Sequence, residues 1–89
     1  MATQLTFEKI GTQNVCKIDD YTSGDVIQVQ LEGSARVSAS ANIPGMPPAV
    51  IGVFENPYGD SVIFSLELPE GLEVTLKTSS NVINAVWTH

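Results

Sequence analysis

Catalytic side chains are scarce in this sequence of 89 residues, which has a single histidine and a single cysteine. The histidine, His89, is the last residue, where chains commonly fray and a general base is hard to hold in place. The cysteine, Cys16, lies in a strand-like stretch, a setting typical of a small buried hydrophobe. One thiol excludes an internal disulfide and suits a reducing compartment. Catalytic triads and paired-cysteine sites therefore lack their residues, and we expect a protein that is not an enzyme.

Basic side chains are also few. Lys9, Lys17, Arg36 and Lys77 stand against ten acidic residues and leave a net charge of −6. No two of the four are close in sequence, whereas nucleic-acid binding normally needs clustered lysines and arginines. We therefore expect no contact with nucleic acid, and we interpret the acidic excess as an aid to solubility.

Long uninterrupted apolar runs are missing as well. The longest apolar run without a charge, residues 43–54, contains three prolines and two glycines and is too short to span a bilayer. The first residues lack the basic start and apolar stretch of a secretory signal. We expect no membrane span, and we expect synthesis in the cytoplasm without a signal peptide.

What the sequence does contain is alternation of apolar and polar residues. In residues 26–32, Ile27, Val29 and Leu31 face one side of an extended chain and polar side chains face the other. No window long enough for a helix keeps helical apolar spacing free of turn residues. The same alternation, or a shorter apolar stretch, recurs along the chain at residues 5–10, 15–18, 35–43, 50–54, 62–68, 72–77 and 82–87. These patterns predict about eight short strands and no helix.

Glycine, proline and asparagine separate the predicted strands. Gly33 and Ser34 form one joint and residues 56–60 another, and residues 69–71 predict a hairpin between residues 62–68 and 72–77. Many short strands at this spacing are typical of a sandwich or barrel. We expect one all-β domain over residues 1–89, a small two-sheet antiparallel β-sandwich of jelly-roll or immunoglobulin-like shape, with a strand order that the pattern does not specify.

One loop is unusually apolar. Residues 43–49 combine three prolines with a glycine, so they form a loop or an edge rather than a central strand. Exposure of an apolar loop to water is unfavourable, so such a loop is a candidate for contact with another protein. The candidate contact residues are Pro44, Met46, Pro47, Pro48 and Val50.

Acidic residues gather in one predicted turn, where Asp19, Asp20 and Asp25 offer carboxylate oxygens of the kind that calcium binds. Their spacing is not that of an EF-hand loop, and an ordinary polar turn held by Asp and Ser side chains accounts for them equally simply. Turn carboxylates also provide the residue type of a glycosidase, but so small a core leaves little room for a cleft. We expect no bound metal or cofactor.

Aromatic residues provide the alternative of ligand stacking. Tyr58, on a turn, and Tyr21 are the candidate stacking residues for a glycan or peptide. Trp87 shares an alternating face with Ile83 and Ala85, so we expect it in the core.

The strands are apolar enough to be hazardous as bare edges, because an uncharged edge recruits other chains. We therefore expect a homo-oligomer or assembly subunit whose partners are copies of itself or a capsid-like lattice. The leading hypothesis is a structural protein of a virion, most simply a bacteriophage capsid-decorating or auxiliary head protein. The alternative hypothesis is a small glycan- or peptide-binding β-sandwich module.

Overall fold

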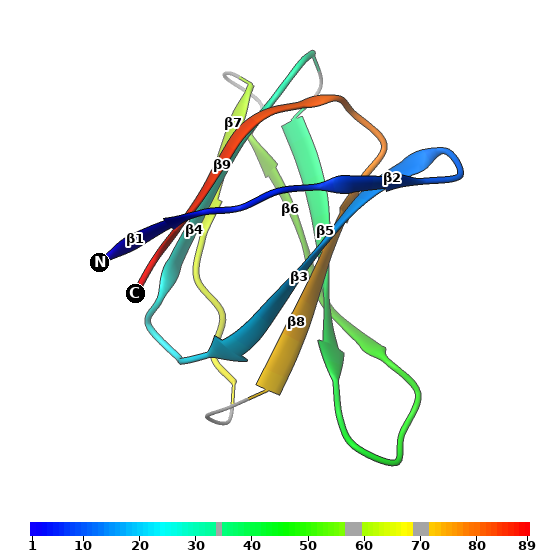
Figure 1. The fold of residues 1–89 in the computed structure, drawn as a ribbon, viewed down its shortest axis with the longest axis vertical. Helices are drawn as coiled ribbons and strands as arrows, with labels where there is room; N and C mark the ends of the chain where they lie inside the picture. The colour runs from blue at the N-terminus through cyan, green and yellow to red at the C-terminus, as the bar shows by residue number, and fades with distance from the viewer. Residues whose placement is uncertain (34, 57–59, 69–71) are drawn as a thin grey trace.

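The computed structural model describes residues 1–33, 35–56, 60–68 and 72–89. Within these residues the chain forms nine strands in two antiparallel sheets (Figure 1). The strands are β1 (Ala2–Gln4), β2 (Glu8–Ile10), β3 (Gln13–Tyr21), β4 (Val26–Leu31), β5 (Ala35–Asn42), β6 (Ala49–Asn56), β7 (Ser61–Phe64), β8 (Leu72–Thr78) and β9 (Val82–Thr88). The predicted all-β, two-sheet antiparallel sandwich is confirmed. Among the described residues, no helix has the length and apolar character needed to cross a membrane.

The strand order identifies the type of sandwich. One sheet has the order β1-β9-β4-β7 and the other has the order β2-β3-β8-β5-β6. When the short β2 is left aside, this is the order of a jelly roll, which is built from two Greek keys. In an immunoglobulin sandwich the last two strands pair within one sheet, whereas β8 and β9 lie in different sheets here. Of the two expected shapes, the strand order matches the jelly roll.

The hairpin predicted between residues 62–68 and 72–77 is wrong, because β7 and β8 belong to different sheets. β7 pairs with β4, and β8 pairs with β3 and β5. The β7 ladder ends at Phe64, and beyond it the Tyr21 hydroxyl accepts a hydrogen bond from the Leu66 N–H at 2.7 Å. The chain then crosses to the other sheet instead of turning back. Residues 69–71, the predicted turn, lie outside the described residues.

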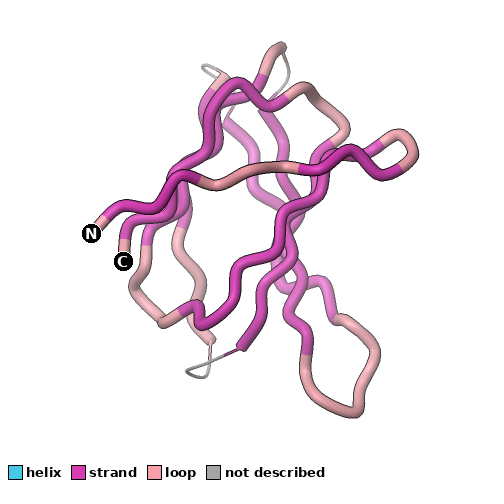
Figure 2. Tube along the Cα trace, viewed as in Figure 1, coloured by secondary structure: helices cyan, strands magenta, loops and turns pink. Residues whose placement is uncertain are grey.

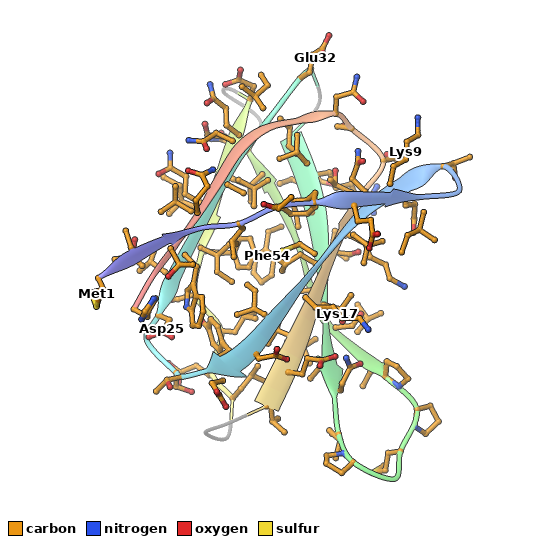
Figure 3. All side chains as sticks on the ribbon, viewed as in Figure 1. Met1, Lys9, Lys17, Asp25, Glu32 and Phe54 are labelled. Carbon is orange, nitrogen blue, oxygen red and sulfur yellow. The ribbon has the colours of Figure 1, made fainter. Side chains whose placement is uncertain are left out.

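The core lies between the sheets and is built from the inward halves of alternating strands. Ile27, Val29 and Leu31 of β4 are fully buried, as their spacing predicts. Phe54 of β6, which is labelled in Figure 3, and Phe64 of β7 stack with ring centroids 4.2 Å apart, so an aromatic pair links the two sheets. Offset and stacked aromatic pairs of this kind add to the free energy gained from burial alone.

An irregularity in β3 places Tyr21 in this core. The pairing of β3 with β8 shifts between Ile18 and Tyr21, where Asp20 adopts a φ of 58°. The shift turns both Ile18 and Tyr21 inward although they are three residues apart, and both are buried. The Tyr21 hydroxyl donates to the carbonyl oxygen of Asp25 at 2.8 Å, so its polar end is satisfied inside the fold.

Candidate interaction surface

The β5–β6 hairpin extends beyond the rest of the sandwich (Figure 2). Between Arg36 and Glu55 it has no charged residue, and residues 37–54 are referred to below as the arm. At the tip, the Met46 N–H donates to the Ile43 carbonyl at 3.1 Å, with Pro44 and Gly45 in the middle of the turn. Gly45 has a φ of 79°, which fits the type II turn that prefers proline followed by glycine. The tip is therefore a defined turn.

Half of the exposed large apolar side chains among the described residues lie on the arm. They are Ile43, Met46, Val50, Ile51 and Val53, and Met46 and Val50 are exposed by 64% and 68%. Three of the candidate contact residues, Pro44, Pro47 and Pro48, are also exposed. The structure thus brings the five residues named from the sequence onto one hairpin and adds Ile43, Ile51 and Val53 to them.

A β-bulge explains how the arm exposes its apolar residues. Ala39 pairs with Gly52 but Ser40 pairs with Val50, so Ile51 is an extra residue in β6. Strict alternation would place Val50 on the inward side with Gly52. The bulge instead turns Val50 to the outward side, on which Val53 also lies. The alternation of apolar and polar residues does not indicate this change of side.

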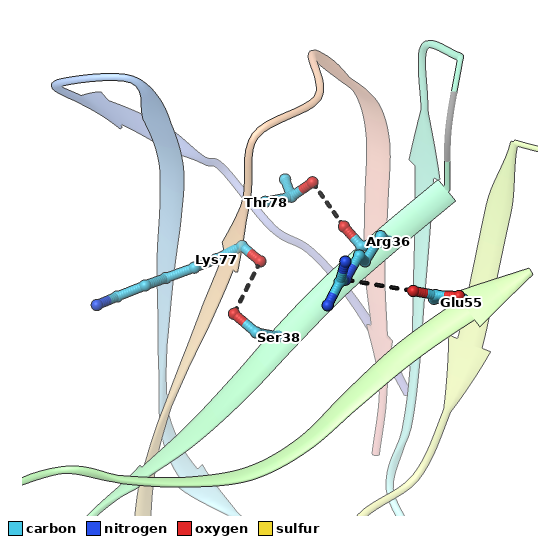
Figure 4. Close-up of polar contacts among 5 residues, drawn as sticks. All are labelled: Arg36, Ser38, Glu55, Lys77 and Thr78. Carbon is cyan, nitrogen blue, oxygen red and sulfur yellow. Dashed lines mark hydrogen bonds and ion pairs between the residues drawn. The ribbon is translucent and has the colours of Figure 1, made fainter.

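The base of the arm is tied to the sandwich by polar contacts (Figure 4). Arg36 Nε lies 3.3 Å from Glu55 Oε1, so an ion pair joins the two ends of the uncharged stretch. From β8, Thr78 Oγ1 donates to the Arg36 carbonyl at 2.8 Å. In turn Ser38 Oγ donates to the Lys77 carbonyl at 3.3 Å. The arm is anchored at its base and free of charge along its length.

Gly52 fixes how the inner side of the arm meets the core. A Cβ atom at this position would lie 2.8 Å from Cζ of the Phe54 ring. The Phe54 ring therefore lies over the glycine and reaches Phe64 on the facing sheet. This close approach joins the arm to the core of the sandwich.

A groove of about 380 Å³ lies on the outer face of the five-stranded sheet, and Ser40, Asn42 and Pro48 of the arm are among its lining residues. Side chains of β3, β5 and β8 line it together with Ile10 of β2 and Pro48. Neither Lys17 nor Lys77 forms an ion pair with another described residue. The lining residues include no aromatic ring and are Ile10, Gln13, Val15, Lys17, Ser40, Asn42, Pro48, Thr75 and Lys77.

Of the two aromatic residues proposed for ligand stacking, the structure describes Tyr21. Tyr21 has no exposed surface, so it is a core residue and its ring is closed to a ligand. Tyr58 lies outside the described residues. Trp87 is half-buried against the core, and its Nε1 donates to Asp25 Oδ2 at 3.0 Å. Sequence spacing suggested an exposed or turn position for Tyr21 because it could not reveal the irregularity at Asp20.

Of the three aspartates considered as calcium ligands, one forms hydrogen bonds within the fold and two are exposed. Asp25 Oδ2 accepts hydrogen bonds from Trp87 Nε1 and from the Thr22 N–H at 3.2 Å. Asp19 and Asp20 are exposed. In the part of the chain that the structure describes, no group of three or more His, Cys, Asp or Glu side chains is placed to hold a metal ion.

The two residues with potential nucleophile or base chemistry are engaged elsewhere. Cys16 is 4% exposed, and burial raises the pKa of its thiol, which keeps it in the unreactive neutral form at neutral pH. His89 Nε2 lies 2.7 Å from Thr3 Oγ1, and its ring packs on Trp87 with centroids 4.3 Å apart. Neither residue faces the groove or the arm.

Comparison with protein families, with curated proteins and with solved structures finds no match for this chain.

Proposed function

We propose that this protein is a non-enzymatic structural subunit of a larger assembly and that the arm binds a neighbouring protein. The observation that carries the proposal is the arm itself, an uncharged hairpin with five exposed large apolar side chains on a chain of net charge −6. Contiguous exposed apolar surface of this kind marks interaction sites, and interface centres are poor in charge and rich in methionine. A defined turn at the tip lowers the entropic cost of ordering the arm on binding.

The assembly that we propose is a virion, with this chain as a bacteriophage capsid-decorating or auxiliary head protein. Support comes from the strand order, because jelly rolls are a common architecture of viral capsid proteins. This support is an analogy between folds. A decorating protein needs one surface that binds a shell, and the arm provides such a surface.

The test uses particles purified from the source of this sequence. We expect mass spectrometry to detect the chain in them at a fixed ratio to the major shell protein. Purified protein added back to particles stripped of it should cosediment with them. The double variant Met46→Asp/Val50→Asp should bind at least about tenfold more weakly, because it places charge in the proposed contact.

A matched control separates contact from net charge. Thr12 and Ser79 are exposed residues outside the arm, so Thr12→Asp/Ser79→Asp adds the same charge elsewhere. This control should bind like the unmodified protein, and circular dichroism should show that both variants fold. Absence of the chain from the particles, or equal binding by both variants, would contradict the proposal.

The groove favours a second candidate function, a peptide-binding module. Two lysines that form no ion pair with another described residue line the groove, together with Ile10, Pro48 and side chains that have hydroxyl and amide groups. An extended acidic peptide matches these groups, whereas a glycan usually needs a stacking ring that this groove lacks.

This second function is tested with a fluorescent peptide that alternates glutamate and threonine. Fluorescence anisotropy should show saturable binding that Lys17→Gln/Lys77→Gln removes. The matched control Lys9→Gln/Arg36→Gln changes the same charge outside the groove and should retain binding. No binding by the unmodified protein, or equal loss in both variants, excludes this function.

A further inference from the structure

Charge is divided unequally between the two sheets. No residue of β1, β4, β7 or β9 is charged. By contrast, all four basic residues and five of the ten acidic residues lie in strands of the five-stranded sheet. The four-stranded sheet is therefore neutral throughout its strands, although the chain as a whole is strongly acidic.

Strand register shows which side chains form the outer surface of this sheet. Gln4, Val86, Gln28 and Ile63 lie opposite one another in a row across all four strands. Neighbouring rows add two groups of small polar or aliphatic residues. The resulting neutral face comprises Ala2, Gln4, Val26, Gln28, Gln30, Ser61, Ile63, Asn84, Val86 and Thr88.

The neutral face combines exposed aliphatic groups with side-chain amides. Ile63 is 62% exposed and Val26 is 39% exposed. The side chains of Gln28 and Gln30 make no hydrogen bond to any other residue that the structure describes. An amide group both donates and accepts, so each can pair with an identical group.

We infer that the neutral face binds the neutral face of a second copy of this chain across a two-fold axis. In such a contact the same surface is present on both copies, so a net charge on that surface faces an equal net charge on the other copy. A chain of net charge −6 can form this contact with least repulsion where its strands have no charge. The five-stranded sheet, with carboxylates on β2, β3, β6 and β8, lacks this property.

The size of the face sets the strength of the contact. The strands β1, β4, β7 and β9 have three, six, four and seven residues, and at about 3.3 Å per residue and about 4.8 Å between strands they cover roughly 300 Å² per copy. Stable interfaces bury about 800 Å² per partner. The neutral-face dimer is therefore weak on its own and forms at high protein concentration. The inference goes beyond the proposed function, because it concerns a different surface and a different partner from those of the arm.

Sedimentation equilibrium between about 10 µM and about 1 mM covers the range in which an interface of this size associates. The weight-average mass should rise from 9.5 kDa toward twice that value. Gln28→Glu changes little but the charge at the centre of the face and should weaken association at least about tenfold. An equal mixture of the Gln28→Glu and Gln28→Lys variants should associate more strongly than either alone.

Two controls make the outcome decisive. Gln13→Glu adds the same charge to an exposed position of β3 and should associate like the unmodified protein. Met46→Asp/Val50→Asp should also keep the dimer, even if it no longer binds particles, so failure of the arm proposal and failure of this inference are distinguishable. A mass of 9.5 kDa at every concentration overturns the inference, as does equal weakening by Gln13→Glu or loss of the dimer in the arm variant.

Discussion

The two sheets of this sandwich have similar inner faces and contrasting outer faces. Each turns its alternating apolar residues inward, as Val29 of β4 and Leu76 of β8 show, and both are fully buried. On the outside, the five-stranded sheet has the charges, the groove and the arm, while the four-stranded sheet is neutral. Alternation in a strand thus determines which side chains are buried, and the outward residues remain free to determine what each face can bind.

The largest effect that tests this comparison is expected at β7, where neighbouring residues face opposite ways. Phe64→Ala removes the ring that stacks on Phe54 and should lower the free energy of unfolding by about 3 to 5 kcal/mol. Ile63→Ala, at an exposed position, should change it by less than about 0.5 kcal/mol. Urea denaturation of dilute protein measures both. A large loss in Ile63→Ala would show that the neutral face behaves as core within one copy.

A smaller effect is expected where a polar contact joins the two sheets. Tyr21 belongs to β3, but its hydroxyl bonds the Leu66 N–H just after β7. Tyr21→Phe leaves that buried N–H without its partner and should lower the free energy of unfolding by about 1 to 3 kcal/mol. Ser23→Ala removes the corresponding contact with Leu68, which is exposed to water, and should cost less.

Tyr21→Phe should also change how the free energy of unfolding depends on pH above neutrality. Burial raises the pKa of Tyr21, the hydrogen bond with the Leu66 backbone lowers it, and the charges of Asp25 and Glu67 raise it, with a raised pKa as the result. The unfolded chain loses this proton near pH 10, so the stabilisation is complete below that pH and declines as pH rises through the folded pKa. The stability difference between the unmodified protein and Tyr21→Phe should therefore shrink above about pH 10. A constant difference up to pH 12 would contradict this account.

The smallest effect is expected at the ion pair that closes the arm. The side chains of Arg36 and Glu55 are 68% and 60% exposed, and such pairs contribute less than about 1 kcal/mol. A double-mutant cycle of Arg36→Gln and Glu55→Gln measures the coupling. A coupling well above that value would mean that the charged sheet depends on its surface pairs for stability.

The sequence predicted the features that depend on neighbouring residues. The alternation in residues 26–31 correctly gave the buried side of β4, and the prolines of residues 43–48 correctly gave a loop. Strand partners were not predictable, because the jelly roll pairs β1 with β9 and separates β7 from β8. Pairings between distant parts of a chain leave no periodic signal in its sequence.

Residues at bulges account for the remaining differences between the sides of the sheets that the sequence predicts and those that the structure shows. Ile83 was expected on the inner face with Trp87, but the shift between Gln30 and Leu31 leaves it unpaired and 57% exposed. Asp20 similarly moves Tyr21 into the core, and Ile51 moves Val50 out of it. A single extra residue reverses the side of every residue after it, and composition does not mark where that residue lies.

The position of β9 within its sheet has a consequence for synthesis. β9 lies between β1 and β4 in its sheet, yet it leaves the ribosome after β1, β4 and β7. Until then β4 and β7 have no complete sheet to join, and their uncharged edges are open to other growing chains. Slow translation or a high local concentration of nascent chains should therefore favour aggregation, and a lower expression temperature or a chaperone that holds β4 should raise the yield of folded protein.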